Sequence, residues 1–186
     1  AIAYSCNIPC YEIAKRISID SLALYSRKFG LGKSTDLMIG DSSGLVPTSH
    51  WKEFEKGERW WKGETLSAAI GQSYLLVTPL QIAQMFGSIA TRNLVKPRML
   101  ESEPVVSAPL DISERTINFL QESMGSAVEF GSARKLKSLT NFEIHAKTGT
   151  AQNSSLARAK QDPTLLEHGW FGCYFSYKHE KPLVLI

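Results

Sequence analysis

Helix-like and strand-like patterns occupy separate parts of this sequence. Over the first 130 or so residues, apolar residues recur at the three- or four-residue spacing of amphipathic helices. Three strand-like stretches follow, at 142–148, 170–177 and 182–186, and the polar stretch 152–167 predicts a loop. Helices gathered before strands indicate an α+β fold, in which helices pack on an antiparallel sheet. We therefore predict one domain, with a helical part over about 1–130 and a sheet part over about 140–186.

Two later helices have clearly marked starts. The segment Thr78-Pro79-Leu80-Gln81 contains a cap, a proline at the first helical position and a glutamine that completes a capping box. A buried helix is expected from there to about Thr91. Ser113 is the expected cap of another helix that runs toward Phe130.

The N-terminal region predicts two short helices. Asn7 is expected to cap a helix that runs to Ile17, with Ile8, Ile13, Ala14 and Ile17 on one apolar face. Asp20 is expected to open the second helix.

Size and composition fit a single globular piece. The chain has 186 residues, 43% of them hydrophobic, which is enough for one core. An excess of three positive charges is too small to indicate a polyanionic partner, so nucleic-acid binding is not expected. No apolar run approaches the ~20 residues that span a bilayer. Cys6, Cys10 and Cys173 are too few for a disulfide framework and lack zinc-site spacing; Cys6 and Cys10, one helical turn apart, are expected to face the core.

A short polar motif, Lys147-Thr148-Gly149-Thr150, is expected at the end of the first strand. Its glycine would let the backbone of a ligand come close, and the neighbouring hydroxyls are suited to binding a carboxylate. This arrangement suits an edge strand that docks a peptide. The alternative is a surface lysine followed by a turn, because four-residue motifs also match by chance.

A second motif, Ser5-Cys6-Asn7, lies at the expected start of the first helix. It matches the S-x-N form of the S-D-N element that accompanies K-T-G in the serine acyl-transferases that recognise penicillin. Alone, a serine and an asparagine at a helix start are more often simple caps. The position of S-x-N upstream of K-T-G-T, in the order that these enzymes use, favours the functional interpretation.

With both motifs, the chain resembles the class B penicillin-binding proteins, and among them the elongation-type branch that maintains rod shape. The resemblance extends along essentially the whole chain, and is carried further by the segments 29–33, 43–47 and 63–83. Ser73 departs from the family, which often has glycine there. The implied fold is that of the penicillin-recognising serine transpeptidases and β-lactamases, with a helical subdomain and an antiparallel sheet.

The resemblance implies an activity and three catalytic residues. In this family a serine attacks the D-Ala-D-Ala carbonyl of a peptidoglycan stem peptide, D-alanine leaves, and the acyl group passes to an amine on a neighbouring strand. β-Lactams intercept the first step. By resemblance, Ser5 relays a proton toward the leaving group, Asn7 hydrogen-bonds the donor peptide, and Lys147 supplies positive potential.

The K-T-G-T motif is implied to bind the substrate. Thr148 and Thr150 would bind its terminal carboxylate, Gly149 would allow close approach, and the backbone N–H of Thr150 would form half of the oxyanion hole. The resemblance implies no metal and no cofactor. The implied partners are peptidoglycan stem peptides, β-lactams and membrane-embedded cell-wall synthesis proteins. The implied location is the cell-wall (periplasmic) side of the cytoplasmic membrane, with an anchor on an upstream segment.

One element of the family pattern is missing: S-x-x-K, which carries the nucleophile, does not precede Ser5. We therefore expect the chain to be the C-terminal portion of one transpeptidase domain, and to be inactive alone. Two stretches match the S-x-x-K pattern, Ser49-His50-Trp51-Lys52 and Ser132-Ala133-Arg134-Lys135. Both follow S-x-N, which is the wrong order, and both are interpreted as a helix-start serine with a solvated lysine.

Other functions fit the same motifs. The alternatives are a serine β-lactamase or β-lactam sensor, and a non-catalytic module that binds peptide; the long similarity at 63–83 favours the transpeptidase. His145 shares a strand face with Lys147 and could act as a ligand or a base, but packed strand residues are the simpler interpretation of His145 and His168. The Trp60-Trp61 pair could line a loop that faces a partner or a membrane, but aromatic packing over a helix is the simpler interpretation.

Overall fold

The computed structural model describes residues 1–37, 40–152, 167–178 and 180–186. The loop predicted at 152–167 lies outside these ranges except for its two end residues. None of the helices in the described ranges has the length and apolar character that a membrane crossing needs. The elements are η1 (Ile2–Tyr4), α1 (Asn7–Ala14), α2 (Ile19–Lys28), α3 (Ser49–Lys56), α4 (Lys62–Ala68), α5 (Pro79–Thr91), β1 (Asn93–Val95), β2 (Ser107–Pro109), α6 (Glu114–Glu129), η2 (Arg134–Ser138), β3 (Phe142–Ala151), β4 (His168–Tyr177) and β5 (Leu183–Leu185).

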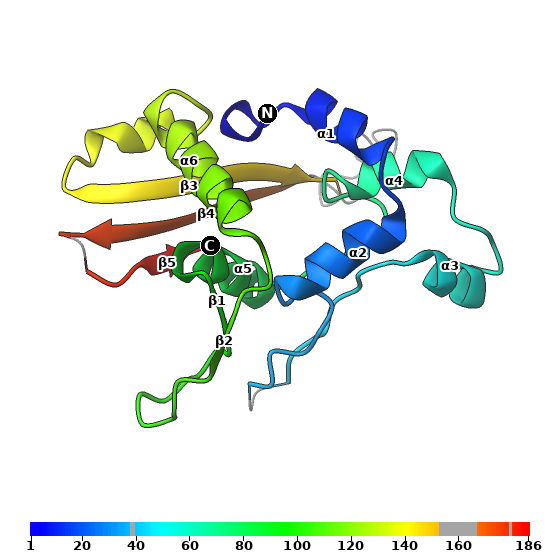
Figure 1. Cartoon of the computed structure of the whole chain (residues 1–186), viewed down its shortest axis with the longest axis horizontal. Coiled ribbons are helices and arrows are strands. Elements are labelled where there is room, and N and C mark those ends of the chain that lie inside the picture. The colour runs from blue at the N-terminus through cyan, green and yellow to red at the C-terminus, as the bar shows by residue number, and fades with distance from the viewer. Residues whose placement is uncertain (38–39, 153–166, 179) are drawn as a thin grey trace.

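Two groups of elements make up the molecule. Helices α1 to α4 gather on one side, and the sheet of β3, β4 and β5 lies on the other side together with α5 and α6 (Figure 1). The predicted order of helices first and strands last is confirmed. A second, two-stranded sheet of β1 and β2 was not predicted, because strands of three residues are too short to show an alternating pattern.

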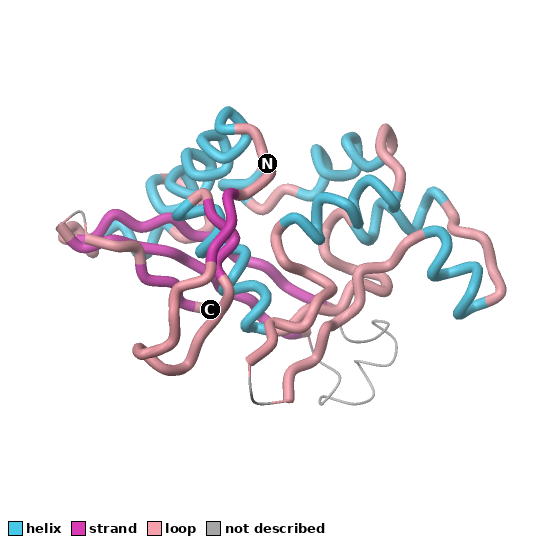
Figure 2. The backbone as a smooth tube through the Cα atoms, turned by 60° about the horizontal axis from the view of Figure 1, so that its bottom comes forward, coloured by secondary structure: helices cyan, strands magenta, loops and turns pink. Residues whose placement is uncertain are grey.

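The main sheet is antiparallel, in the order β3-β4-β5. Its strands are among the magenta segments of Figure 2. β3 pairs with β4 along its full length, from Phe142 opposite Tyr177 to Ala151 opposite His168. Among the described residues β3 has no strand on its other side, so it is an edge strand. The three predicted strands are confirmed, but β3 extends to Ala151, so the K-T-G-T motif lies inside the strand rather than at its end.

Both faces of this sheet are covered by helices. Successive strand residues point to opposite faces, and β4 buries its two faces in two separate clusters. One cluster joins the sheet to α5 and α6 through Phe86, Ile89, Met124 and Tyr174. The other joins it to the end of α6 and the segment that follows through Val128, Ala133, Ala146 and Cys173.

The predicted capping box at the start of α5 is confirmed. Thr78 Oγ1 accepts the backbone N–H of Gln81 (3.2 Å), and Gln81 Oε1 accepts that of Thr78 (3.0 Å). Gln81 is fully buried, and its Nε2 also donates to the carbonyl oxygens of Lys33 (2.8 Å) and Ser43 (2.9 Å). One side chain therefore starts a helix and anchors the irregular segment beside it. The predicted cap of α6 at Ser113 is also confirmed.

The two predicted starts of the N-terminal helices are wrong by one or two positions. Cys6 is the N-cap of α1, and Asn7 is the first helical residue. Ser18 caps α2 by accepting a backbone N–H. Asp20 instead accepts the backbone N–H (2.9 Å) and the hydroxyl (2.6 Å) of Ser49 at the start of α3. A carboxylate can cap a neighbouring helix as readily as its own, and sequence spacing does not distinguish the two.

The apolar face predicted for α1 is not buried. Ile8 is 67% exposed and Ile13 is 60% exposed, while Ala14 alone is buried. Helical periodicity identifies an apolar face, but it does not show what covers that face.

Candidate active site

The short segment before α1 brings Ser5 to the edge of the sheet. Ser5 ends η1 in a left-handed conformation (φ 51°), and its backbone N–H donates to the Ile2 carbonyl oxygen (3.2 Å). The Ala3 carbonyl oxygen in turn accepts the backbone N–H of Ser132 (2.9 Å), just beyond α6. Gly131 permits this contact, because a Cβ at that position would lie 2.1 Å from the Ala3 oxygen.

Ser5 meets the K-T-G-T motif directly, although the two motifs are 142 positions apart. Lys147 Nζ donates to Ser5 Oγ at 2.5 Å and also to the Thr148 carbonyl oxygen. Ser5 Oγ lies 3.1 Å from Thr148 Oγ1 and 3.3 Å from the Thr148 carbonyl oxygen. The structure therefore brings together the serine of S-x-N and the first two residues of K-T-G-T in one hydrogen-bonded cluster.

A groove of about 410 Å³ runs between these elements. Its walls come from residues 1–10, from residues 69–72 and from the strand residues Lys147 to Thr150. Asn7, Gly149 and Thr150 line this groove without joining the Ser5 cluster. Cys6 is exposed, Cys10 is half-buried, and both line the groove, so the prediction that they face the core is wrong. The cause is that this side of α1 faces the groove beside β3, while α1 packs against α4.

The edge of β3 offers backbone groups to the groove. Gln72 Nε2 donates to the Thr150 carbonyl oxygen (3.2 Å), and Gln72 Oε1 accepts the backbone N–H of Gln152 (3.4 Å). Because the N–H and C=O of one strand residue point to the same side, the Thr150 N–H also points away from β4. This donor is available to a ligand that lies along the strand.

Burial and charge set the electrostatics of the cluster. Loss of solvent around the ammonium lowers the pKa of Lys147, and the nearby thiol of Cys10 offsets part of that effect. A half-buried ammonium in hydrogen-bond contact with a hydroxyl gives the groove a local positive potential.

The two histidines stand apart from this cluster. His145 Nδ1 is bonded to the Gln121 carbonyl oxygen of α6 (2.8 Å), and its ring stacks on Tyr174 with centroids 4.6 Å apart. This agrees with the interpretation as a packed strand residue. His168 pairs with Ala151 at the far end of β3.

The two neighbouring tryptophans have different surroundings: Trp60 is packed and Trp61 is half-exposed. Trp60 donates its ring N–H to Thr65 of α4 (2.9 Å) and meets Tyr74 edge-on, as predicted for packing. Trp61 is half-exposed, with Arg59 stacked over its ring at 4.0 Å.

The two stretches with S-x-x-K letters have unexpected surroundings. Lys52 is not solvated: its side chain is 2% exposed, and Nζ pairs with Glu64 at 2.5 Å. Ser132 is no isolated helix-start serine, since its Oγ lies 2.8 Å from Thr148 Oγ1. Ser132 and Gln72 are the site neighbours that sequence reasoning missed. Gln72 lies in the family-like stretch 63–83, but no short-range pattern connects either residue to β3.

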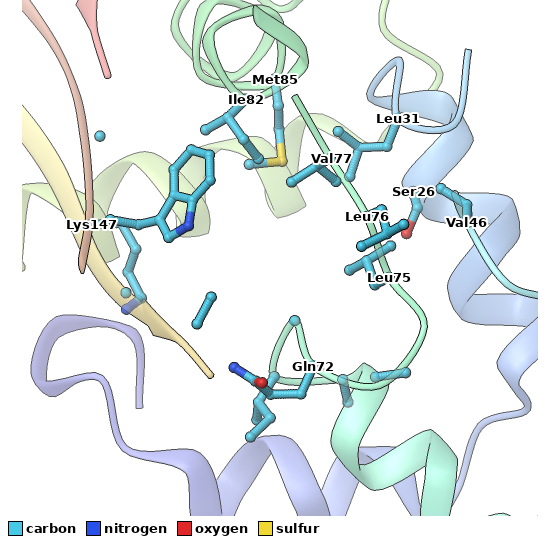
Figure 3. Close-up of a pocket in the computed structure, with 18 of the residues that line it drawn as sticks. Ser26, Leu31, Val46, Gln72, Leu75, Leu76, Val77, Ile82, Met85 and Lys147 are labelled. Atoms are coloured by element: carbon cyan, nitrogen blue, oxygen red, sulfur yellow. The ribbon is translucent and has the colours of Figure 1, made fainter. Parts of the chain in front are cut away.

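A second, larger cavity of about 670 Å³ opens behind the cluster. Lys147 forms one wall, and the opposite wall consists of aliphatic side chains (Figure 3), which include Leu31, Val46, Leu75, Val77, Ile82 and Met85. A largely apolar cavity of this size beside an ammonium is unusual in a packed interior.

An α+β scaffold with S-x-N and K-T-G-T on two sides of one groove is typical of the serine enzymes that recognise penicillin. A family model described as the penicillin-binding protein transpeptidase domain matches residues 1–186. The chain therefore belongs to the penicillin-binding protein transpeptidase family. The resemblance to the class B, rod-shape type and the predicted fold class are both confirmed.

Individual relatives agree with this assignment. Peptidoglycan D,D-transpeptidase MrdA of Acinetobacter baumannii is 31% identical over 92% of this chain and 28% of its own length. PBP2 from Helicobacter pylori superposes with a TM-score of 0.83 at 27% identity, over 97% of this chain and 33% of that one. A chain from a peptidoglycan synthase complex superposes with a TM-score of 0.85 at 32% identity, over 99% of this chain and 32% of that one. The chain thus spans about a third of the length of these relatives.

Proposed function

We propose that this chain is the C-terminal portion of a peptidoglycan D,D-transpeptidase domain, and that it forms half of an active site whose nucleophile lies on an S-x-x-K segment outside the chain. The observation that carries this proposal is the 2.5 Å contact of Lys147 Nζ with Ser5 Oγ at the groove. It supplies a hydroxyl proton donor and a positive charge beside a strand edge that a peptide can occupy.

The chemistry assigns a task to each residue. The serine of S-x-x-K attacks the D-Ala-D-Ala carbonyl, and its proton passes to a base on its own segment. The C–N bond breaks with its electron pair on the leaving nitrogen, Ser5 protonates that nitrogen, and the Lys147 ammonium returns a proton to Ser5. An amine of a second stem peptide then takes up the acyl group and releases the serine.

The other site residues bind the donor peptide. Asn7 hydrogen-bonds its backbone, the hydroxyls of Thr148 and Thr150 bind its terminal carboxylate, and Gly149 lets it approach the strand. The Thr150 N–H points into the groove and serves as one oxyanion donor. Losing one such donor costs roughly 3–4 kcal/mol of transition-state stabilisation in comparable enzymes.

Two apolar surfaces support an active site that needs a further segment. The aliphatic cavity of about 670 Å³ adjoins Lys147, where a nucleophile would have to reach the cluster. The exposed face of α1, with Ile8 and Ile13, is a second surface that a folded domain is expected to cover. The proposal assigns this cavity to the S-x-x-K segment, because its apolar lining suits an apolar element that brings the nucleophile beside Lys147.

The proposal extends to partners and location. Stem peptides are the substrates, β-lactams the inhibitors, and membrane-embedded cell-wall synthesis proteins the partners, on the periplasmic side of an anchored protein. The relative within a peptidoglycan synthase complex supports such an assembly.

Acylation by a fluorescent penicillin tests the proposal. The full-length protein that contains this chain is expected to be labelled stoichiometrically, and its variant with the S-x-x-K serine replaced by alanine is expected to be unlabelled. Residues 1–186 alone are expected to be unlabelled too. Labelling of the isolated chain would contradict the division of the active site. Rapid nitrocefin turnover by the full-length protein would indicate a β-lactamase, and peptide binding without acylation would indicate a binding module.

A further inference from the structure

A row of hydroxyl groups continues from the Ser5 cluster to the surface. Thr148 Oγ1 lies 3.1 Å from Ser5 Oγ on one side and 2.8 Å from Ser132 Oγ on the other. Ser132 is exposed, whereas Ser5 and Thr148 are half-buried. This hydrogen-bonded row, Lys147–Ser5–Thr148–Ser132, therefore connects a half-buried ammonium to solvent through three hydroxyls.

Each hydroxyl has one proton to donate, so it matters in which direction the hydrogen bonds along this row run. Ser5 Oγ already accepts from Lys147. If Ser132 donates to Thr148, the Thr148 proton can point to Ser5 at rest or to the carboxylate of a bound substrate, and in both cases the Ser5 proton stays available to another acceptor. If instead Ser5 donates to Thr148, the Ser5 proton is held in the row and is not available to a leaving group.

From this geometry we propose that Ser132 is a positioning residue, which donates to Thr148 and thereby leaves the Ser5 proton free for the leaving group. Water can donate to the exposed Ser132 oxygen, which favours donation by Ser132 into the row. With the hydroxyls donating in this direction, the acceptor that the described residues leave to the Ser5 proton at rest is the Thr148 carbonyl oxygen at 3.3 Å, a long bond that a substrate nitrogen can replace. This inference rests on the proposed function, because it concerns the protonation of the leaving group.

The proposal predicts a dependence on the leaving group. Departure of an amide or β-lactam nitrogen requires a proton, whereas departure of a thiolate does not. A loss of the Ser132 hydroxyl should therefore slow acylation by a penicillin and spare acylation by a thioester that has the same terminal carboxylate. A general weakening of the site, or poorer carboxylate binding by Thr148, would slow both.

The test uses the full-length protein and compares acylation rates with a fluorescent penicillin and with such a thioester. Ser132→Ala is expected to slow penicillin acylation about tenfold and thioester acylation less than twofold. Ser132→Thr keeps the hydroxyl and is expected to restore most of the penicillin rate. Ser138→Ala, in the same exposed segment but bonded to the Lys135 carbonyl oxygen, is the matched control and should match the wild type.

Equal slowing with both probes, or no slowing with either, would overturn the positioning role while leaving the transpeptidase proposal intact. If the wild-type full-length protein reacts with neither probe, the proposed function itself is wrong, and this inference falls with it.

Discussion

Gln72 bonds to Thr150 at the free edge of β3, with Nε2 donating to the Thr150 carbonyl oxygen at 3.2 Å. The same amide accepts the backbone N–H of Gln152, so one side chain makes two bonds of the kind that a neighbouring strand would make. It connects the loop after α4 to the strand and closes one end of the groove.

This bridge predicts a local change in hydrogen exchange. Gln72→Ala removes the acceptor of the Gln152 amide, and a net bond of about 0.5–1.5 kcal/mol corresponds to roughly two- to tenfold faster exchange at that amide. Hydrogen–deuterium exchange at single-residue resolution on the full-length protein measures it. Gln121→Ala, which removes a bond to the Ile89 carbonyl oxygen instead, should leave the Gln152 amide unchanged. Unchanged exchange in Gln72→Ala would contradict the bridge.

Gly131 is predicted to control the position of Ser5. In Gly131→Ala the new Cβ would meet the Ala3 carbonyl oxygen, so η1 must shift and carry Ser5 away from Lys147. We expect a loss of about 1–3 kcal/mol in the free energy of unfolding, together with slower penicillin acylation. Gly63→Ala is the control, since a Cβ there meets no atom within 4 Å. Wild-type acylation by Gly131→Ala would show that Ser5 is positioned in another way.

The lowered pKa of Lys147 predicts an early alkaline limb in the acylation rate. Burial favours the neutral amine, so the ammonium is lost below the ordinary lysine value of 10.5. The rate should fall as the pH rises through that lowered pKa, because the donor to Ser5 disappears. Between the lowered pKa and the ordinary value the folded state binds fewer protons than the unfolded state, so this group makes stability rise with pH there.

Two variants identify the group that titrates. Lys147→Arg stays charged at these pH values and should lose this alkaline limb, at a lower overall rate. Cys10→Ser removes the thiol that partly offsets the lowered pKa of Lys147, so it should keep the limb and move it to lower pH. An unchanged limb in Lys147→Arg would assign the titration to another group.

Ser73 carries a backbone strain that glycine would relieve. Its φ is 68°, in the left-handed region that disfavours a side chain, and the family often has glycine at this position. The relief of strain exceeds the entropy cost of glycine in the unfolded chain, so Ser73→Gly should raise the free energy of unfolding by ~0.5 kcal/mol. Ser67→Gly, within α4, should lower it by a similar amount. Denaturant unfolding of both variants measures the difference, and destabilisation by Ser73→Gly would contradict it.

Short-range sequence patterns predicted where helices and strands lie better than they predicted which side chains are buried. The capping box at Thr78, the cap at Ser113 and the three final strands follow from short-range chemistry, and all were predicted. The exposure of Ile8 and the burial of Lys52 depend on what packs against them, which no periodic pattern specifies.

The candidate site was also predicted only in part: its two motifs were predicted, and two of its neighbouring residues were not. The two motifs followed from their letters and order, but Gln72 and Ser132 reach β3 only through tertiary contacts. The S-x-x-K letters around Ser132 stand in the wrong place for a nucleophile, and its contact with Thr148 depends on the fold rather than on any local pattern.

The central claim is that Ser5 and Lys147 act as one unit at the groove, and a double-mutant cycle tests it most directly. Ser5→Ala, Lys147→Ala and the double variant of the full-length protein are compared by their rates of penicillin acylation. Each single variant should lose most of the rate, and the double variant should fall within about threefold of the slower single variant, since a pair that acts as a unit is lost by either change. Multiplicative losses, or a near wild-type rate in either single variant, would contradict the account.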